Sequence, residues 1–182
     1  MDPLTSTMSL PGEGALTIRL LSDGDVEALT ALFESLSPDT RRRYGPHPFD
    51  RATAERLCAH TDPAITMRFV AQRADGALVA YMILTHLIGP DDIARYEGWL
   101  LPEPRRASLA PVVADAYQNR GLGQLMARHV LAAAQQVGID QVVLMGGVQA
   151  TNDRAYHFYR VLGFEPVGSF WTGSGVGRVL NY

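Results

Sequence analysis

Apolar residues recur along this chain with two spacings, one typical of strands and one typical of helices. Residues 16–21 alternate between apolar and polar side chains, which predicts a first strand. Residues 26–36 carry apolar side chains every three to four positions, which predicts a helix. The same spacings predict, further along, a helix over 52–60 capped by Asp50, a hairpin over 67–72 and 78–87, strands over 108–114 and 141–145, helices over 122–137 and 152–162, and a last hairpin over 164–171 and 176–182.

Three features do not follow these spacings. Residues 1–14 are polar and contain Pro and Gly, so we expect a flexible tail ahead of a single domain over residues 15–182. Residues 88–107 allow two interpretations: 93–101 extends the sheet, or the segment lines a cleft as an irregular insertion. Pro111 lies inside a predicted central strand, where it removes a ladder donor. It indicates a bulge, a missing strand pair, or a strand at the sheet edge.

Composition excludes several classes of protein. A chain of 182 residues, 47% of them hydrophobic, is large enough for one domain with an adequate core. The net charge of −3 gives no reason to expect binding to nucleic acid or to an acidic membrane surface. Cys58 is the single cysteine and the five histidines lack ligand spacing, so we expect no metal site. No run is long enough to span a bilayer and no signal-peptide pattern is present, so a cytoplasmic location is the default expectation.

The most informative stretch is the turn between strand 108–114 and helix 122–137. Gly121 and Gly123 open the helix, and Gly138 stands where a glycine commonly ends one. The first N–H groups of a helix have no intrahelical acceptor and lie at the positive end of its dipole, so this turn is a candidate phosphate site. A tight turn without a ligand is the alternative. A Rossmann loop is excluded because Met126 replaces the third glycine, and a P-loop is excluded because the chain contains no lysine.

Two motifs resemble one known family. Gln118-Asn-Arg-Gly-Leu-Gly123 is similar to the Gln/Arg-x-x-Gly-x-Gly/Ala signature of the GNAT superfamily of N-acetyltransferases. The stretch from Asn152 to Phe164 resembles that family's Asn-x-x-Ala-x-x-x-Tyr-x-x-x-Gly-Phe segment, and the two motifs occur in the same order. The resemblance implies an α/β (α+β mixed sheet), GNAT-like fold. Six to seven mostly antiparallel strands and about four helices are then expected, with a cleft where two central strands splay apart.

The resemblance also implies acetyl-CoA as co-substrate, without a metal, and a primary amine of a small molecule or protein as acceptor. Tyr159 then matches the family's general acid, which donates a proton to the leaving thiolate; the alternative is a core aromatic. Likewise, Arg120 is either a phosphate contact or a solvated side chain, and Asn152 is a pantetheine contact, a helix cap or both. Carried over by position, the cofactor-binding residues are Val112, Val113, Gln118, Asn119, Arg120, Gly121, Leu122, Gly123, Gln124, Asn152 and Tyr159.

The base that takes the proton from the amine is less evident. No carboxylate follows strand 141–145, where some relatives carry a Glu. Glu97 lies among apolar neighbours that would raise its pKa, so it is our candidate base, although a solvent-facing role fits equally well. Glu103 and Asp115 are further candidates. The alternative for Asp115 is a turn residue just before the motif over residues 118–123. Ordered water is the remaining alternative.

These observations favour an acetyl-CoA-dependent N-acetyltransferase that works by direct attack of the amine, without an acyl-enzyme. The alternative is a non-catalytic CoA-binding module that acts as a sensor or interaction domain. The sequence does not specify the acceptor. Arg41, Arg42 and Arg43 either attract an acidic acceptor or form a solvated face, and the last hairpin is a candidate homodimer surface. Four aromatic residues are candidates to line either an acceptor pocket or a dimer interface: Tyr96, Trp99, Phe170 and Trp171.

Overall fold

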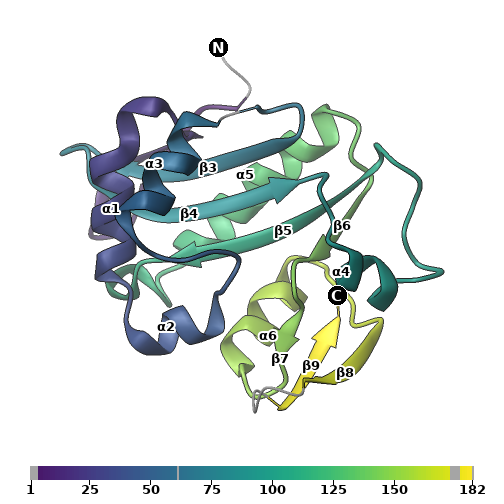
Figure 1. Cartoon of the computed structure of the whole chain (residues 1–182). Coiled ribbons are helices and arrows are strands. Elements are labelled where there is room, and N and C mark those ends of the chain that lie inside the picture. The colour runs from purple at the N-terminus through teal and green to yellow at the C-terminus, as the bar shows by residue number, and fades with distance from the viewer. Residues whose placement is uncertain (1–3, 61, 173–176, 182) are drawn as a thin grey trace.

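A computed structural model describes residues 4–60, 62–172 and 177–181 (Figure 1). Its main element is a six-stranded sheet in the order β1-β2-β3-β4-β5-β6. The pairs are antiparallel except for β5 and β6, which run parallel. The six strands are β1 (Ser6–Leu10), β2 (Gly14–Leu20), β3 (Thr66–Arg73), β4 (Leu78–Thr85), β5 (Arg106–Val113) and β6 (Gln141–Leu144).

A second, smaller sheet has the order β7-β9-β8 and contains the predicted last hairpin. Its antiparallel strands are β7 (Val148–Gln149), β8 (Gly168–Thr172) and β9 (Gly177–Asn181). The sequence did not predict β7, which is too short to show a periodicity. Most of the turn predicted between β8 and β9 lies outside the described residues.

Helices cover both faces of the large sheet (Figure 1). On one face lie α1 (Val26–Ser35) and α3 (Arg51–Ala59), and on the other lies α5 (Leu122–Gln136). The remaining helices are α2 (Pro38–Arg43), α4 (Pro90–Arg95) and α6 (Asp153–Val161), with single 3-10 turns at η1 (Asp23–Asp25) and η2 (Asp115–Tyr117). The mixed fold predicted from the family resemblance is confirmed, although the described residues contain more strands and helices than expected.

The two faces of the sheet have separate apolar cores. Met126 and Val130 of α5 pack in one core with Phe69 and Met82, while Phe33 of α1 packs in the other with strand residues that include Tyr81 and Val70. Every residue of β4 is buried because this strand contributes to both cores. This explains why its sequence is almost continuously apolar and does not alternate.

An ion pair between the partly exposed Arg19 and the buried Asp25 lies at the start of α1. Arg19 of β2 donates to both carboxylate oxygens of Asp25, at 2.7 and 2.6 Å. Ser22 donates to the same carboxylate through its backbone N–H and its hydroxyl, at 2.8 and 2.9 Å. Burial alone would raise the pKa of Asp25, but the hydrogen bonds from Arg19 and Ser22 outweigh it and hold this pKa below its ordinary value.

The predicted N-terminal tail is wrong for residues 6–10. They form β1, which pairs along its whole length with β2, and Leu10 is buried. His129 of α5 also contacts this segment, with its ring nitrogens 3.2 Å from Ser6 Oγ and 3.1 Å from Leu4 O. Three of the five residues of β1 are Ser or Thr, so little in the sequence pointed to this edge strand, whose stability comes from pairing with β2 and not from its own apolar content.

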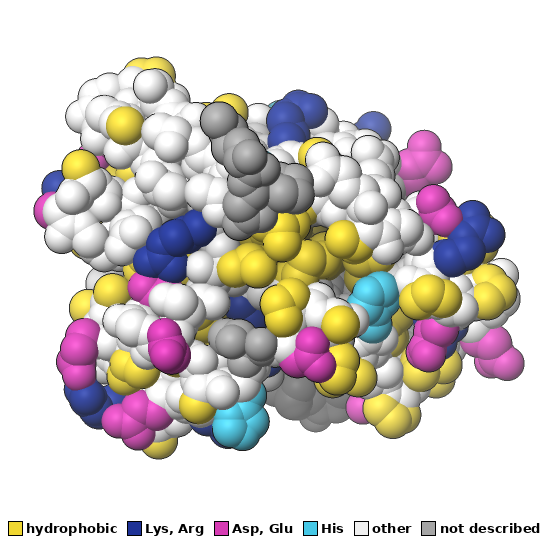
Figure 2. Space-filling model, turned by 90° about the horizontal axis from the view of Figure 1, so that it is seen from above, with side chains coloured by type: hydrophobic (Ala, Val, Ile, Leu, Met, Phe, Trp, Pro, Cys, Tyr) yellow, Lys and Arg dark blue, Asp and Glu magenta, His cyan; other side chains and the backbone are white. Residues whose placement is uncertain are grey.

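Most charged residues lie at the surface, with Asp25 and Asp92 as buried exceptions. Figure 2 shows the upper face, where Arg, Asp and Glu side chains lie mainly toward the rim and a group of hydrophobic side chains lies near the centre. Among the described residues, no helix is both long and apolar enough to cross a membrane. Cys58 is buried in the core beside α1, and burial raises the pKa of its thiol to about 11, so it is a packing residue.

Candidate active site

The large sheet opens where β6 separates from β5. The two strands pair only over residues 106–109 of β5, and the last connection is from Met145 N–H to the carbonyl of Leu109, at 3.1 Å. Gly146 and Gly147 then adopt positive φ angles of 72° and 71°, a conformation that side chains disfavour, and the chain turns away. The remainder of β5, up to Val113, therefore has no strand beside it on this side.

The segment 88–107 holds this turn in place. The carboxylate of Asp92 in α4 accepts a hydrogen bond from Gly146 N–H, with both oxygens at 3.2 Å. Tyr96 donates its hydroxyl to the carbonyl of Leu144 at 3.1 Å, and both Asp92 and Tyr96 are buried. The prediction that 93–101 extends the sheet is wrong. The segment supports the end of β6, and its Tyr96 and Trp99 line a separate hollow and not the cleft beside β5.

Pro111 occupies the open edge of β5. The register between β4 and β5 runs without interruption from Ser108 to Val113, so the expected bulge is absent and a missing pair is the correct reading. Ladder hydrogen bonds alternate along an antiparallel pair. Because Ala114 N–H donates to Val79, the backbone groups of Val112 face β4, and those of Pro111 and Val113 face the opening. Pro111 therefore loses no hydrogen bond. Of the two valines predicted to contact the cofactor, Val113 presents its backbone groups to the opening, whereas those of Val112 face β4.

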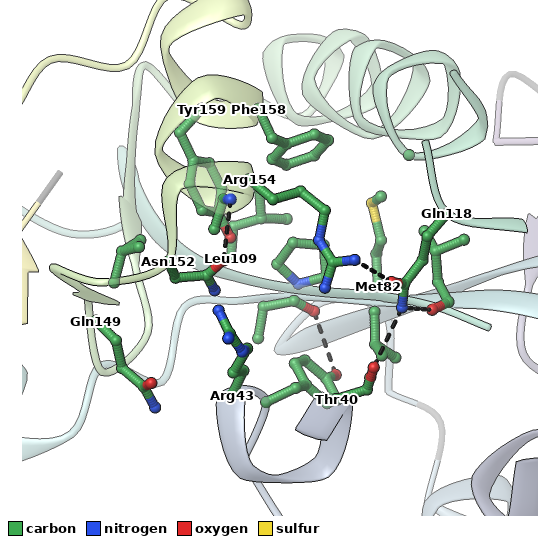
Figure 3. Close-up of a pocket in the computed structure, with 18 of the residues that line it drawn as sticks. Thr40, Arg43, Met82, Leu109, Gln118, Gln149, Asn152, Arg154, Phe158 and Tyr159 are labelled. Carbon is green, nitrogen blue, oxygen red and sulfur yellow. Dashed lines mark hydrogen bonds between the residues drawn. The ribbon is translucent and has the colours of Figure 1, made fainter. Parts of the chain in front are cut away.

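A cleft of about 670 Å³ occupies this opening (Figure 3). Its floor is the exposed edge of β5, with α6 and the 145–149 turn on one side and the end of α2 on the other. The predicted loop residues Gln118, Asn119, Gly121, Gly123 and Gln124 all line it. So do Val112, Val113, Asn152 and Tyr159, which places most of the predicted cofactor residues around one cavity.

The loop at one end of the cleft has an uncapped helix start. Asn119 and Gly121 have positive φ angles of 60° and 83°, and no side chain caps the first turn of α5. The N–H groups of this turn are therefore available to an anion. A Cβ added to Gly121 would meet no atom within 4 Å, so the space before this backbone is open.

Three of the motif residues act through packing or lie outside the cleft. A Cβ on Gly123 would lie 3.2 Å from a ring carbon of Phe158, so this glycine permits close packing of α5 on α6. Leu122 is fully buried and can offer only its backbone. Arg120 does not line the cleft; it forms an ion pair with Glu13 of the β1–β2 turn. Arg120 is thus a paired surface side chain in this structure, and its contact with a phosphate stays a prediction.

Gln118 connects three walls of the cleft through its side chain. Its amide nitrogen donates to the carbonyl of Val113 at 2.9 Å and to the hydroxyl of Thr40 in α2 at 3.2 Å. Its amide oxygen accepts from Arg154 of α6. Figure 3 shows this network crossing the cleft. The sequence motif pointed to the backbone of this loop but gave no signal for the side-chain bridge.

Asp115 attaches α2 to the same loop. Its carboxylate accepts from the backbone N–H and hydroxyl of Ser37, at 3.0 and 2.7 Å, and from the hydroxyl of Thr40 at 2.8 Å. Burial would raise the pKa of Asp115, but these hydrogen bonds lower it below its ordinary value. Asp115 is thus committed to holding the start of α2, which argues against a role as base.

Helix α6 places two predicted residues on the cleft. Asn152 is the N-cap, and its side-chain oxygen accepts from Ala155 N–H at 3.2 Å. Figure 3 shows its amide nitrogen directed into the cleft, so the residue caps the helix and still presents a donor. Tyr159 follows two turns later on the same face and points into the cleft above Leu109.

The environment of Tyr159 keeps its phenol protonated. Its ring packs against Phe158 and Phe164, at centroid distances of 4.9 and 5.4 Å, and only 7% of the residue is exposed. Burial, with a smaller contribution from Tyr96, raises the pKa of Tyr159 well above its ordinary value. A neutral phenol at the cleft wall can donate a proton but is a poor base.

Cationic residues dominate the charge of the cleft. Arg42, Arg43 and Arg154 line it, and the described lining residues include no Asp or Glu. Glu97 is exposed in the turn after α4 and is not among the lining residues. Glu103 is also exposed and pairs with Arg106. Neither glutamate therefore reaches the cleft in this structure.

Comparison with known proteins agrees with this architecture. The model of the acetyltransferase (GNAT) family matches residues 29–164, which cover most of the chain. No curated protein sequence matches the chain. The GNAT domain of S. lividans PAT has a TM-score of 0.76 and 20% identity, with coverage of 100% of this chain and 98% of that one.

Two further solved structures share the fold. The ribosomal-protein-S5-alanine acetyltransferase from Vibrio fischeri has a TM-score of 0.72 and 9% identity, covering 91% of this chain and 90% of that one. The structure of yncA from Salmonella typhimurium with its cofactor acetyl-CoA has a TM-score of 0.67 and 17% identity, covering 91% and 89%. At these identities the likeness establishes the fold alone.

Proposed function

Because the chain belongs to the acetyltransferase (GNAT) family, we propose that it transfers an acetyl group from acetyl-CoA to a primary amine in the cleft beside β5. One observation carries the proposal. The unpaired edge of β5 leads from the uncapped start of α5 to the buried phenol of Tyr159, within one cavity. A solved structure of the same fold, that of yncA, contains acetyl-CoA as its cofactor, which supports this choice of donor.

The diphosphate, the pantetheine arm and the thioester of acetyl-CoA each have a chemically suitable partner in the cleft. The diphosphate fits the first-turn N–H groups of α5, which have no side-chain cap and face open space at Gly121. The amide-bearing pantetheine arm fits the backbone of Val113, whose groups point away from β4, and the amide of Asn152. This arrangement would bring the thioester to the end of the cleft lined by Tyr159.

The chemistry then follows from the state of Tyr159. The amine nitrogen forms a bond to the thioester carbonyl carbon, and collapse of the tetrahedral intermediate breaks the carbon–sulfur bond. Tyr159 is protonated and lies within the cavity, so it can give its proton to the departing thiolate. Solvent returns a proton to the phenol, and the products are the acetylated amine and CoA.

The proton on the amine needs a different acceptor. The described lining residues contain no carboxylate, and Glu97 lies elsewhere. The cationic cleft itself lowers the pKa of a bound amine, because nearby positive charge disfavours the ammonium form. Water at the cleft mouth then takes the proton, which is the alternative that remains after the three carboxylate candidates.

A second function is favoured by the same absence of a carboxylate. A module that binds acetyl-CoA without turnover, as a sensor or interaction domain, needs the phosphate loop and not Tyr159. Thiol release from acetyl-CoA, measured with a panel of amines, distinguishes the two. Amine-dependent release, with the acetylated amine identified by mass spectrometry, supports the transferase. Saturable binding of acetyl-CoA without release for any amine supports the sensor.

A further inference from the structure

The end of the cleft farthest from the phosphate loop carries a guanidinium that the donor does not require. Figure 3 shows Gln118 at one end and Arg43, Gln149 and Tyr159 at the other, with Arg43 pointing from α2 toward Asn152. A diphosphate bound to the loop at Gln118 therefore lies away from Arg43. The guanidinium instead faces the place where thioester and amine would meet.

The structure holds Arg43 in this position from both ends of α2. Asp115 binds the start of the helix through Ser37 and Thr40. At its other end, the carbonyl of Arg42 accepts a hydrogen bond from Gln149 Nε2 at 3.2 Å, across the cleft mouth. A short helix fixed twice presents its last side chain with little freedom, which favours a directional contact with a ligand.

The charge of Arg43 is only partly compensated by the protein. Asp39 is its ion-pair partner, with an Nε to Oδ2 distance of 3.0 Å, but the same carboxylate also pairs with Arg42 at 2.5 Å. One carboxylate thus serves two guanidinium groups. Arg43 is the less exposed of the two, with 29% of its side chain accessible against 67% for Arg42. Asp39 pairs with Nε of Arg43, and among the described residues no group is paired with its two Nη atoms. The Nη edge of the guanidinium is therefore left for a ligand.

Together with Arg154, these groups make the cleft unfavourable for a polycation. A ligand that carries several ammonium groups would meet three arginines and no described carboxylate in the lining. A carboxylate on the acceptor would instead pair with a planar guanidinium, which binds it through two parallel hydrogen bonds.

Resting on the proposed function, we propose that the acceptor is a small amine that carries its own carboxylate, and that Arg43 binds this carboxylate beside the reaction centre. The substrate class is that of free amino acids and related amino carboxylates. A polyamine or an amine without an anionic group is expected to be a poor acceptor.

The test compares matched pairs of acceptors. Proteinogenic L-amino acids and ω-amino acids are each assayed against the corresponding amide, with spermidine included, by thiol release from acetyl-CoA. An amide has a lower amine pKa than its parent acid and so more free amine, which means that a preference for the acid cannot come from basicity. We expect at least one acid to exceed its amide by about 10- to 100-fold in kcat/KM, the usual effect of a charged hydrogen-bond partner.

Arg43 is tested by substitution in the same assay. Arg43→Gln is expected to lower kcat/KM for the acid by about 10- to 100-fold more than for its amide, which removes the preference for the acid, and Arg43→Lys to restore part of it. Arg128→Gln, on the exposed surface of α5 and outside the cleft lining, is the charge-matched control and should keep the preference.

The outcomes separate the two proposals. Faster turnover of amides or spermidine than of any acid overturns the inference and leaves the acetyltransferase proposal standing. A preference for acids that survives Arg43→Gln also overturns it, because the recognising group would then be another one. If no amine of either kind releases thiol although acetyl-CoA binds, the proposed function fails and the inference fails with it.

Discussion

Substitution of Gly121 separates backbone strain from anion binding at the start of α5. This residue has a φ of +83°, and a Cβ would meet no atom within 4 Å. Gly121→Ala therefore adds no clash, and its expected effect is the strain of a left-handed residue, about 1–2 kcal/mol. For a domain of this size each kcal/mol lowers Tm by about 2–4 °C, so Tm should fall by about 2–8 °C. Gly24→Ala is the control, since its φ is not positive and its Cβ would make an ordinary contact at 3.9 Å.

The assay is thermal unfolding of wild type and variants with and without acetyl-CoA. A ligand at about 100 times its Kd stabilises the native state by roughly 2.7 kcal/mol, which is a rise in Tm of about 5–11 °C here. Gly121→Glu places a carboxylate before the proposed phosphate site and should abolish this rise, whereas Gly121→Ala and Gly24→Ala should retain most of it. A folded Gly121→Glu protein with the full rise would show that the diphosphate lies elsewhere. No rise in wild type would refute binding of acetyl-CoA itself.

Three further predictions concern the fold around the cleft. Asp25→Asn, which breaks the pair with Arg19, should lower the free energy of unfolding by about 2–3 kcal/mol at pH 7. Because the pKa of Asp25 is lowered by folding, this difference should shrink below about pH 4, as the carboxylate protonates. Urea titrations at pH 7 and pH 3 measure the loss of unfolding free energy, and an equal loss at both pH values would contradict the assignment. Gly123→Ala should cost about 1–3 kcal/mol through contact with Phe158 and should be partly rescued by Phe158→Leu; additive losses would exclude this contact as the cause. Asp115→Asn should speed amide hydrogen exchange in α2 without affecting α5, and unchanged exchange in α2 would show that the carboxylate is not its anchor.

The elements that the sequence predicted well are those with a local periodicity and local end signals. Helix α5 was predicted from its apolar spacing and from Gly138, which has the positive φ expected of a terminal glycine. Helix α3 was predicted from Asp50, whose side chain accepts from Thr53 N–H as a cap. These features depend on residues a few positions apart, so they are visible in the sequence.

The elements that it missed depend on distant partners. Strand β1 exists because it pairs with β2. Residues 93–101 were read as a possible strand, whereas residues 93–95 are the end of α4, whose start at Gly89-Pro90 is typical of a helix. In the site, the backbone loop and Tyr159 were predicted from motifs. The roles of Asp115 and Gln118 were not, because their partners in α2 and α6 lie 36 to 78 residues away. Arg43 was indistinguishable from its neighbours until α2 was placed beside the cleft.

Amine-dependent thiol release by the wild-type and Tyr159→Phe proteins, at saturating acetyl-CoA, is the decisive comparison. Loss of one buried hydroxyl leaves the aromatic packing in place, so the variant should fold and still bind acetyl-CoA. We predict that wild type releases thiol only when an acceptor amine is present. In the variant, kcat should be reduced by at least about 100-fold, as expected for loss of a general acid. Equal rates in the two proteins would contradict the assignment of Tyr159 and, with it, the mechanism proposed for this cleft.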